Sequence, residues 1–190
     1  VQSDNGDNRL QLGGFLQMDT RFALGDTQER VTDSFVMRRF RLMLQGRLAR
    51  HFEYFWNVDF AGGQVNNRDI FFDTVFSPAF RVRVGKQKPL FSYDRFLLIA
   101  AMPMIERGMS TNVATDRDTG VQVLGDVAGG VVSYSAFVGN GTVDGGSSEV
   151  DANESKDVVA RVILRPWARR RASALNALSV GIAGNTGMQP

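Results

Sequence analysis

The residues best suited to chemistry in this sequence are arginines that alternate with apolar side chains over residues 35–48. Successive side chains of an extended strand point to opposite faces. One face would carry Phe40, Leu42, Leu44 and Leu48, and the other Arg39, Arg41, Gln45 and Arg47. The apolar face requires a protein core or lipid. The cationic face requires water, anions or carboxylates.

Arginine suits anion binding because its planar guanidinium presents a rigid set of donors that matches carboxylate and phosphate. Among the 22 basic residues, only Lys86, Lys88 and Lys156 are lysines. If the apolar faces met lipid, a water-filled lumen lined by arginines would attract anions. The arginines expected to face it are Arg39, Arg41, Arg47, Arg81, Arg83 and Arg161. Asp59, Asp69 and Asp73 would face the same lumen, so structural ion pairing across strands is an equal alternative.

A period of two extends over most of the chain and predicts nine strands. They are expected at residues 9–24, 35–48, 52–61, 70–76, 80–84, 119–124, 131–138, 156–165 and 175–184. Several reach the length that a tilted strand needs to cross a bilayer, and aromatic residues lie near strand ends. Long and short connections alternate, as in an up-and-down meander. We therefore expect an all-β, antiparallel, up-and-down transmembrane β-barrel; a soluble β-sandwich or barrel would show the same alternation.

Residues 86–118 lack sustained alternation and predict a long loop, which in a compact domain is usually functional. The apolar run 97–102 would pack this loop against the wall or a neighbouring subunit. We expect it to fold inward and narrow the barrel, with Lys86, Lys88, Ser92, Tyr93, Arg95 and Arg107 as candidate ligand groups. Residues 1–8 are expected to be a flexible N-terminus, and residues 9–190 one partial barrel domain.

Other kinds of site find little support in the sequence. There is no cysteine, no zinc or nucleotide-binding motif, and the acidic loop at 144–157 lacks EF-hand spacing. Asp116, Arg117 and Asp118 are expected to anchor a loop by ion pairs. The basic stretch 169–171 is better explained by a turn near lipid headgroups than by nucleic-acid binding. We therefore expect no enzyme activity, no cofactor and no metal site.

Five segments resemble the phosphate-selective porins O and P, among them residues 134–141, which resemble the family's strand that ends in an N-G loop. Residues 84–91 resemble the family's G-x-x-K-P-x-F segment, which opens its constriction loop, and residues 104–107 resemble F-M-E-R. Residues 117–123 resemble R-D-x-G-V-Q-V, and Phe60-Ala61-Gly62 resembles the D-F-A-G end of the third strand. Met102-Pro103 departs from the family's polar residues before F-M-E-R, which weakens the transfer of loop ligands.

The resemblance implies a 16-stranded barrel in the outer membrane of a Gram-negative bacterium, of which about nine strands lie in this part of a longer protein. It implies a homotrimer in contact with lipid and lipopolysaccharide that passes phosphate or polyphosphate. It places Arg38 or Arg39, Lys88, Ser92 and Arg107 near the constriction, with Asp73 as an acidic residue there.

The function expected from residues and resemblance together is a passive, anion-selective channel. Its expected anion-contacting residues are Arg38, Arg39, Arg41, Asp73, Arg81, Arg83, Lys86, Lys88, Ser92 and Arg107. Two alternatives remain open: a porin that is general or takes other solutes, with structurally paired arginines, and a soluble β-rich binding domain.

Overall fold

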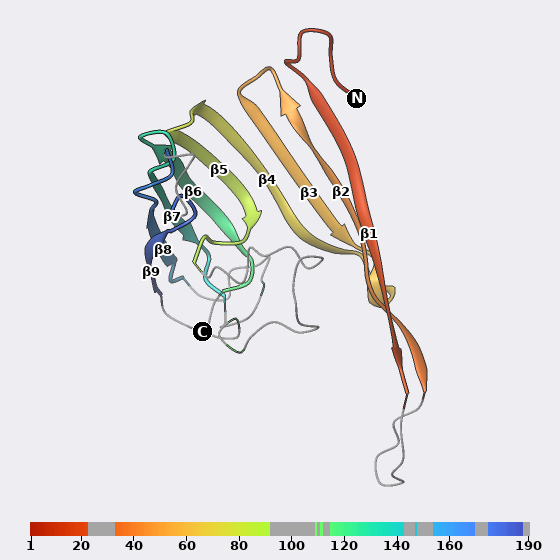
Figure 1. Cartoon of the computed structure of the whole chain (residues 1–190). Helices are drawn as coiled ribbons and strands as arrows, with labels where there is room; N and C mark the ends of the chain where they lie inside the picture. Colours follow the sequence, from red (N-terminus) through yellow and green to blue (C-terminus); the bar gives the residue numbers. More distant parts are fainter. Residues whose placement is uncertain are drawn as a thin grey trace.

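The computed structural model describes residues 1–22, 33–91, 109, 111, 115–142, 147, 154–169 and 175–187. Nine strands form one antiparallel sheet in which each strand pairs with its neighbours in sequence (Figure 1). They are β1 (Arg9–Arg21), β2 (Ser34–Leu48), β3 (Phe52–Asp59), β4 (Asn66–Ser77), β5 (Phe80–Gln87), β6 (Asp118–Val127), β7 (Val132–Gly139), β8 (Asp157–Leu164) and β9 (Val180–Thr186). The predicted all-β, up-and-down order is confirmed.

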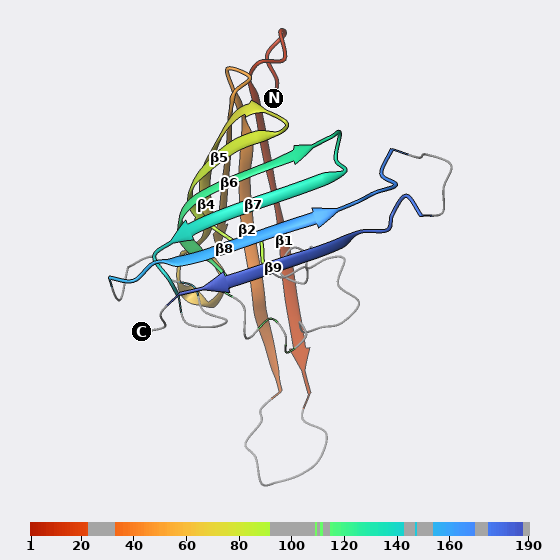
Figure 2. The same cartoon turned by 90° about the vertical axis from the view of Figure 1, so that its left-hand side faces the viewer.

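The strand ends differ from the prediction at several places. β4 begins at Asn66, and β5 continues to Gln87, so Lys86 is a strand residue and not part of the loop. β6 begins at Asp118, and β9 covers only residues 180–186. A 3-10 turn, η1 (Ala61–Gly63), connects β3 to β4. The sheet is curved, and its strands change direction progressively from β1 to β9 (Figure 2).

Apolar side chains lie on the exposed face of the sheet and charged side chains on the buried one. In β2, Phe40 and Leu42 are 38% and 42% exposed, whereas Arg41 between them is 7% exposed. Within the described residues, the buried hydrophobic core consists of Val58, Phe137 and Val159 alone, while the buried polar set is much larger. This distribution is the reverse of a soluble domain. No helix among the described residues is long and apolar enough to cross a membrane.

Two β-bulges bring extra arginines onto the polar face. The register between β1 and β2 shifts at Gln17/Met18, so that Arg38 lies between two consecutive cross-strand positions, opposite no single residue of the β1 register. A bulge adds one residue to a strand and re-aims a side chain. Strict alternation would place Arg38 on the face of Phe40; instead its guanidinium bonds to Asp19. A second shift at Asn57/Val58 does the same for Arg68 on β4.

The connection between β2 and β3 is a tight turn at which Ala49 and Arg50 both have positive φ, 48° and 64°. Two left-handed residues in a hairpin normally call for Asn-Gly. Residues 1–8 support the turn: Ala49 N donates to Asn8 Oδ1 at 3.0 Å, and the Arg50 guanidinium pairs with Asp7. The hydrogen bond to Asp7 and its negative charge raise the pKa of Arg50. The expected flexibility of residues 1–8 stays a prediction.

Candidate functional site

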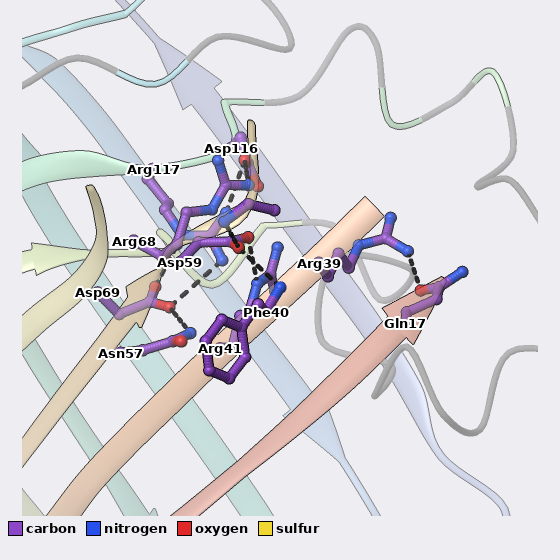
Figure 3. Close-up of polar contacts among 11 residues, drawn as sticks. Gln17, Arg39, Phe40, Arg41, Asn57, Asp59, Arg68, Asp69, Asp116 and Arg117 are labelled. Atoms are coloured by element: carbon purple, nitrogen blue, oxygen red, sulfur yellow. Dashed lines mark hydrogen bonds and ion pairs between the residues drawn. The ribbon is translucent and has the colours of Figure 1, made fainter. Parts of the chain in front are cut away.

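A cluster of charged side chains lies on the polar face where β2, β3 and β4 meet the segment that enters β6. We call it the loop-end cluster; it comprises Arg41, Asn57, Asp59, Arg68, Asp69, Asp116 and Arg117 (Figure 3). Arg41 Nε lies 2.8 Å from Asp59 Oδ2, and Arg117 Nε lies 2.9 Å from Asp69 Oδ1. Arg117 Nη1 also contacts Asp116 at 2.7 Å, while Asn57 donates to Asp69 at 2.8 Å.

The loop-end cluster balances three arginines against three aspartates, and its ion pairs are largely withdrawn from solvent. The side chains of Arg117 and Asp69 are only 4% and 8% exposed. Removing one partner of such a pair leaves an uncompensated buried charge, which is strongly destabilising. The cluster therefore fixes the entry of β6 to β4. The predicted ion-paired anchor is confirmed for Asp116 and Arg117, whereas Asp118 accepts backbone hydrogen bonds from Thr119 and Gly141.

Arg68 is held more loosely than the other two arginines of this cluster. Its Nη2 lies 3.6 Å from Asp116 Oδ2, and its buried Nε has no hydrogen-bond partner among the described residues. Residue spacing alone does not predict Arg68 as a site residue. Its neighbour Asp69 is the one feature of the sequence that points to this position. The bulge that turns Arg68 to the polar face depends on the pairing of β3 with β4, which the sequence of one strand does not show.

Arg38 and Arg39 lie next to the loop-end cluster along β2. Arg38 Nη1 pairs with Asp19 Oδ2 at 2.8 Å, and Arg39 Nη1 donates to the neutral amide oxygen of Gln17 at 2.5 Å. Both arginines therefore reach the polar face. Two consecutive guanidinium groups on one face give this point of the wall two sets of donors.

A second group of charges lies at the opposite end of the strands, beside the turns at 49–51 and 78–79. We call it the turn-end cluster; it comprises Arg9, Arg47, Glu53, Asp73, Arg81 and Arg83, which line a cavity of about 380 Å³. Arg83 donates two hydrogen bonds to the buried carboxylate of Asp73, from Nε to Oδ1 at 2.6 Å and from Nη2 to Oδ2 at 2.8 Å. Its guanidinium also lies 3.8 Å from the centre of the Phe71 ring, a cation–π contact.

The remaining charges of the turn-end cluster are paired less tightly. Arg47 Nη2 contacts Glu53 at 2.7 Å, but about half of the Arg47 side chain is exposed. Arg81 Nη1 reaches Glu53 only at 3.5 Å and Asp73 only at 4.0 Å. The sequence did not predict that Arg9 and Glu53 belong to the turn-end cluster. The cross-strand register that brings them to it cannot be obtained from residue spacing alone.

The chain turns back over the polar face after β5. Pro89 is fully buried, and Leu90 lines a cavity of about 200 Å³ together with Arg81, Leu124 and Tyr134. Because Arg81 and Leu124 face each other near the turn end of β5 and β6, Leu90 lies over the sheet and not beyond its edge. Lys88, next to Pro89, is half-buried.

The predicted site residues thus fall into separate places. Arg41 belongs to the loop-end cluster, whereas Asp73, Arg81 and Arg83 belong to the turn-end cluster. Lys86 donates to the carbonyl oxygen of Asn67 at 2.9 Å. Ser92 and Arg107, with Tyr93 and Arg95, lie outside the described residues. Asp73 is thus at the turn end, away from Arg38 and Arg39.

The family model described as phosphate-selective porin O and P matches residues 10–186. The chain belongs to this family. The match covers most of the chain and confirms the resemblance carried by the central motifs. A search of curated proteins finds no match. In this porin-family chain, the apolar outer face and the polar face described above are the two surfaces from which a function must be argued.

Proposed function

We propose that this chain forms part of the wall of an outer-membrane channel that passes anions passively, with phosphate or polyphosphate as the main solute. The observation that carries the proposal is the reversed burial: Phe40 and Leu42 are exposed while Arg41 is buried on the opposite face. A lipid-facing arginine costs about 2–4 kcal/mol near the bilayer midplane. Lipid therefore belongs on the apolar face and water on the face with the arginines.

The proposed membrane is that of a Gram-negative bacterium, with the short turns toward the periplasm and the longer connections, in contact with lipopolysaccharide, toward the exterior. We further propose that nine strands contribute to a 16-stranded barrel that assembles as a trimer. Membership of a porin family, which contains channels and not enzymes, supports a non-enzymatic role. The exposed aromatics near strand ends, such as Phe22, Phe52 and Phe76, fit the girdles of such barrels.

The proposed constriction uses the segment that follows β5. Leu90 lies over the polar face, and this supports a loop that folds inward and narrows the lumen. In this proposal, anions contact Arg38 and Arg39 on β2 and Lys88 in the segment that enters the loop, with Ser92 and Arg107 as further candidates. Several weak sites in series allow transit, whereas one deep site would trap the ion.

The tightly paired arginines have a different proposed role. Arg41, Arg83 and Arg117 each form short ion pairs, so they hold the wall and the loop entry in place. This observation also favours the second candidate function, a porin without anion selectivity in which the arginines are structural.

Planar-bilayer recordings separate the two functions. The reversal potential in a salt gradient should show anion preference, and millimolar phosphate should block the chloride current. Arg39→Ala and Lys88→Ala should each weaken the block by about tenfold, since each removes a charge-assisted contact. Arg169→Ala, in the turn after β8, is the matched control and should leave the block unchanged. Cation preference at neutral pH would reject the anion channel, and the absence of both anion preference and phosphate block would favour the unselective porin.

A further inference from the structure

The polar face carries an unusual order of charges across the first five strands at its turn end. In the cross-strand register, Arg9 lies opposite Arg47, Arg47 opposite Glu53, Glu53 opposite Asp73, and Asp73 opposite Arg83. The row therefore reads positive, positive, negative, negative, positive. Two of its four cross-strand pairs are like-charged, an arrangement that is destabilising when the charges stand directly opposite each other.

Structural pairing leaves the Arg9–Arg47 end of this row with excess positive charge. Among the described residues, the guanidinium of Arg9 has one hydrogen-bond partner, the neutral Gln11 Oε1, at 3.3 Å. Glu53 is the carboxylate nearest to Arg47, and it also forms an ion pair with Arg81. Both carboxylate oxygens of Asp73 accept hydrogen bonds from Arg83. Of the two opposed guanidinium groups, Arg47 shares the carboxylate of Glu53 with Arg81, and Arg9 contacts only a neutral amide among the described residues, so this end of the row calls for a further negative charge.

A cavity lies at this position and has room for such an anion. Its volume of about 380 Å³ is many times the ~30 Å³ share of one water molecule. Four arginines and two carboxylates line it, and Gln2 and Gly6 of the N-terminal segment lie at its edge. That segment is tied to the β2–β3 turn through Asn8 and Asp7, so it partly encloses the cavity.

We propose that Arg9, Arg47 and Arg81 form a second oxyanion site at the turn end of the channel, separate from the constriction at Arg38 and Arg39. The ligand class is a tetrahedral oxyanion such as phosphate or sulfate, because guanidinium forks bind two oxygens at once. Arg81 can turn from its distant carboxylates, 3.5 and 4.0 Å away, to the ligand. Glu53 competes with the anion for Arg47 and Arg81. The inference rests on the proposed function, because anions reach this face only if the lumen holds water.

Calorimetric titration of the purified full chain in detergent with inorganic phosphate, at low ionic strength, tests the site directly. The double variant Arg9→Gln/Arg47→Gln should weaken one phosphate-binding step by about tenfold, the loss expected for charge-assisted contacts. Glu53→Gln should strengthen the same step severalfold, since it removes the competing carboxylate. Sulfate should compete with phosphate at this step. The matched control is Arg21→Gln, at the far end of β1, which should leave this step unchanged.

The opposite effects of the double variant and of Glu53→Gln keep a folding defect from imitating the result. An unchanged isotherm in the double variant, weaker binding in Glu53→Gln, or an equal loss in Arg21→Gln would overturn the second site. Chloride competing as well as sulfate would overturn the ligand class. Failure of the proposed function looks different, because the unmodified channel would then prefer cations in planar bilayers. If Arg39-dependent phosphate block persists and Arg9→Gln/Arg47→Gln has no effect, only the second site is rejected.

Discussion

Individual arginines of this protein differ in what their partners allow them to do. Arg117 is enclosed by Asp69 and Asp116 and is almost fully buried. Arg9, Arg47 and Arg81 have exposed side chains or distant carboxylates. Since a buried, fully paired charge cannot exchange its partner for a passing anion at low cost, the arginines divide into those that fix the wall and those proposed to contact solute.

Removal of a buried partner should therefore affect stability far more than removal of a half-exposed one. Asp69→Asn leaves Arg117 with Asp116 alone and should lower the free energy of unfolding by roughly 3–5 kcal/mol. Urea unfolding in detergent, followed by tryptophan fluorescence, measures this loss. Glu53→Gln is the matched control; its ion pairs are partly solvated, and it should cost about 1 kcal/mol or less. Equal losses in the two variants would contradict the assignment of Asp69 as a structural anchor.

At the scale of elements, the β2–β3 turn carries a local conflict between sequence and conformation. Ala49 and Arg50 both adopt positive φ, a conformation that costs a residue with a side chain roughly 1–2 kcal/mol. The hydrogen bonds that Ala49 N and the Arg50 guanidinium donate to Asn8 and Asp7 hold the turn against this cost. A residue that accepts positive φ should relieve this conformational cost at the turn.

Ala49→Gly should accordingly raise the free energy of unfolding by about 0.5–1 kcal/mol, because glycine adopts positive φ without steric cost but loses more entropy on folding. Thermal or urea unfolding of the detergent-solubilised protein measures the change. Ala79→Gly, in the β4–β5 turn, is the matched control: its φ is not positive, so the same substitution should be neutral or slightly destabilising. Stabilisation by both glycines would show that positive φ at Ala49 is not the cause.

The sequence predicted the elements better than it predicted the site. Period-two alternation is a property of each strand alone, so the nine strands and their apolar faces could be read from residues such as Phe40 and Leu42. The positions of Arg38 and Arg68 depend on bulges, which arise from the pairing of two strands and not from either one. The Arg9–Arg47 pair likewise requires the register of the first hairpin. Asp73 was assigned to the constriction by resemblance, but it pairs with Arg83 at the turn end.

For the whole molecule, the decisive property is which face of the sheet meets hydrocarbon. The exposed outer face has apolar side chains on five adjacent strands, β2 to β6: Leu42, Trp56, Phe72, Val84 and Val121. A soluble protein would rarely leave so large an apolar surface open to water. The proposed orientation therefore predicts opposite effects of an added arginine at Leu42 and at Gln45 of β2, which are only three residues apart.

Leu42→Arg should block stable insertion into lipid vesicles, because it puts a guanidinium on the lipid side at a cost of about 2–4 kcal/mol near the midplane. Gln45→Arg places the same group on the opposite, solvated face of β2 and should insert like the unmodified protein. Urea-driven refolding into vesicles, read by protease protection and by mobility without heating on gels, compares the two variants. Equal insertion of both, together with a monodisperse species of the unmodified chain in buffer without detergent, would replace the channel with a water-soluble β-domain. Failure of Gln45→Arg alone would reverse the assignment of the two faces.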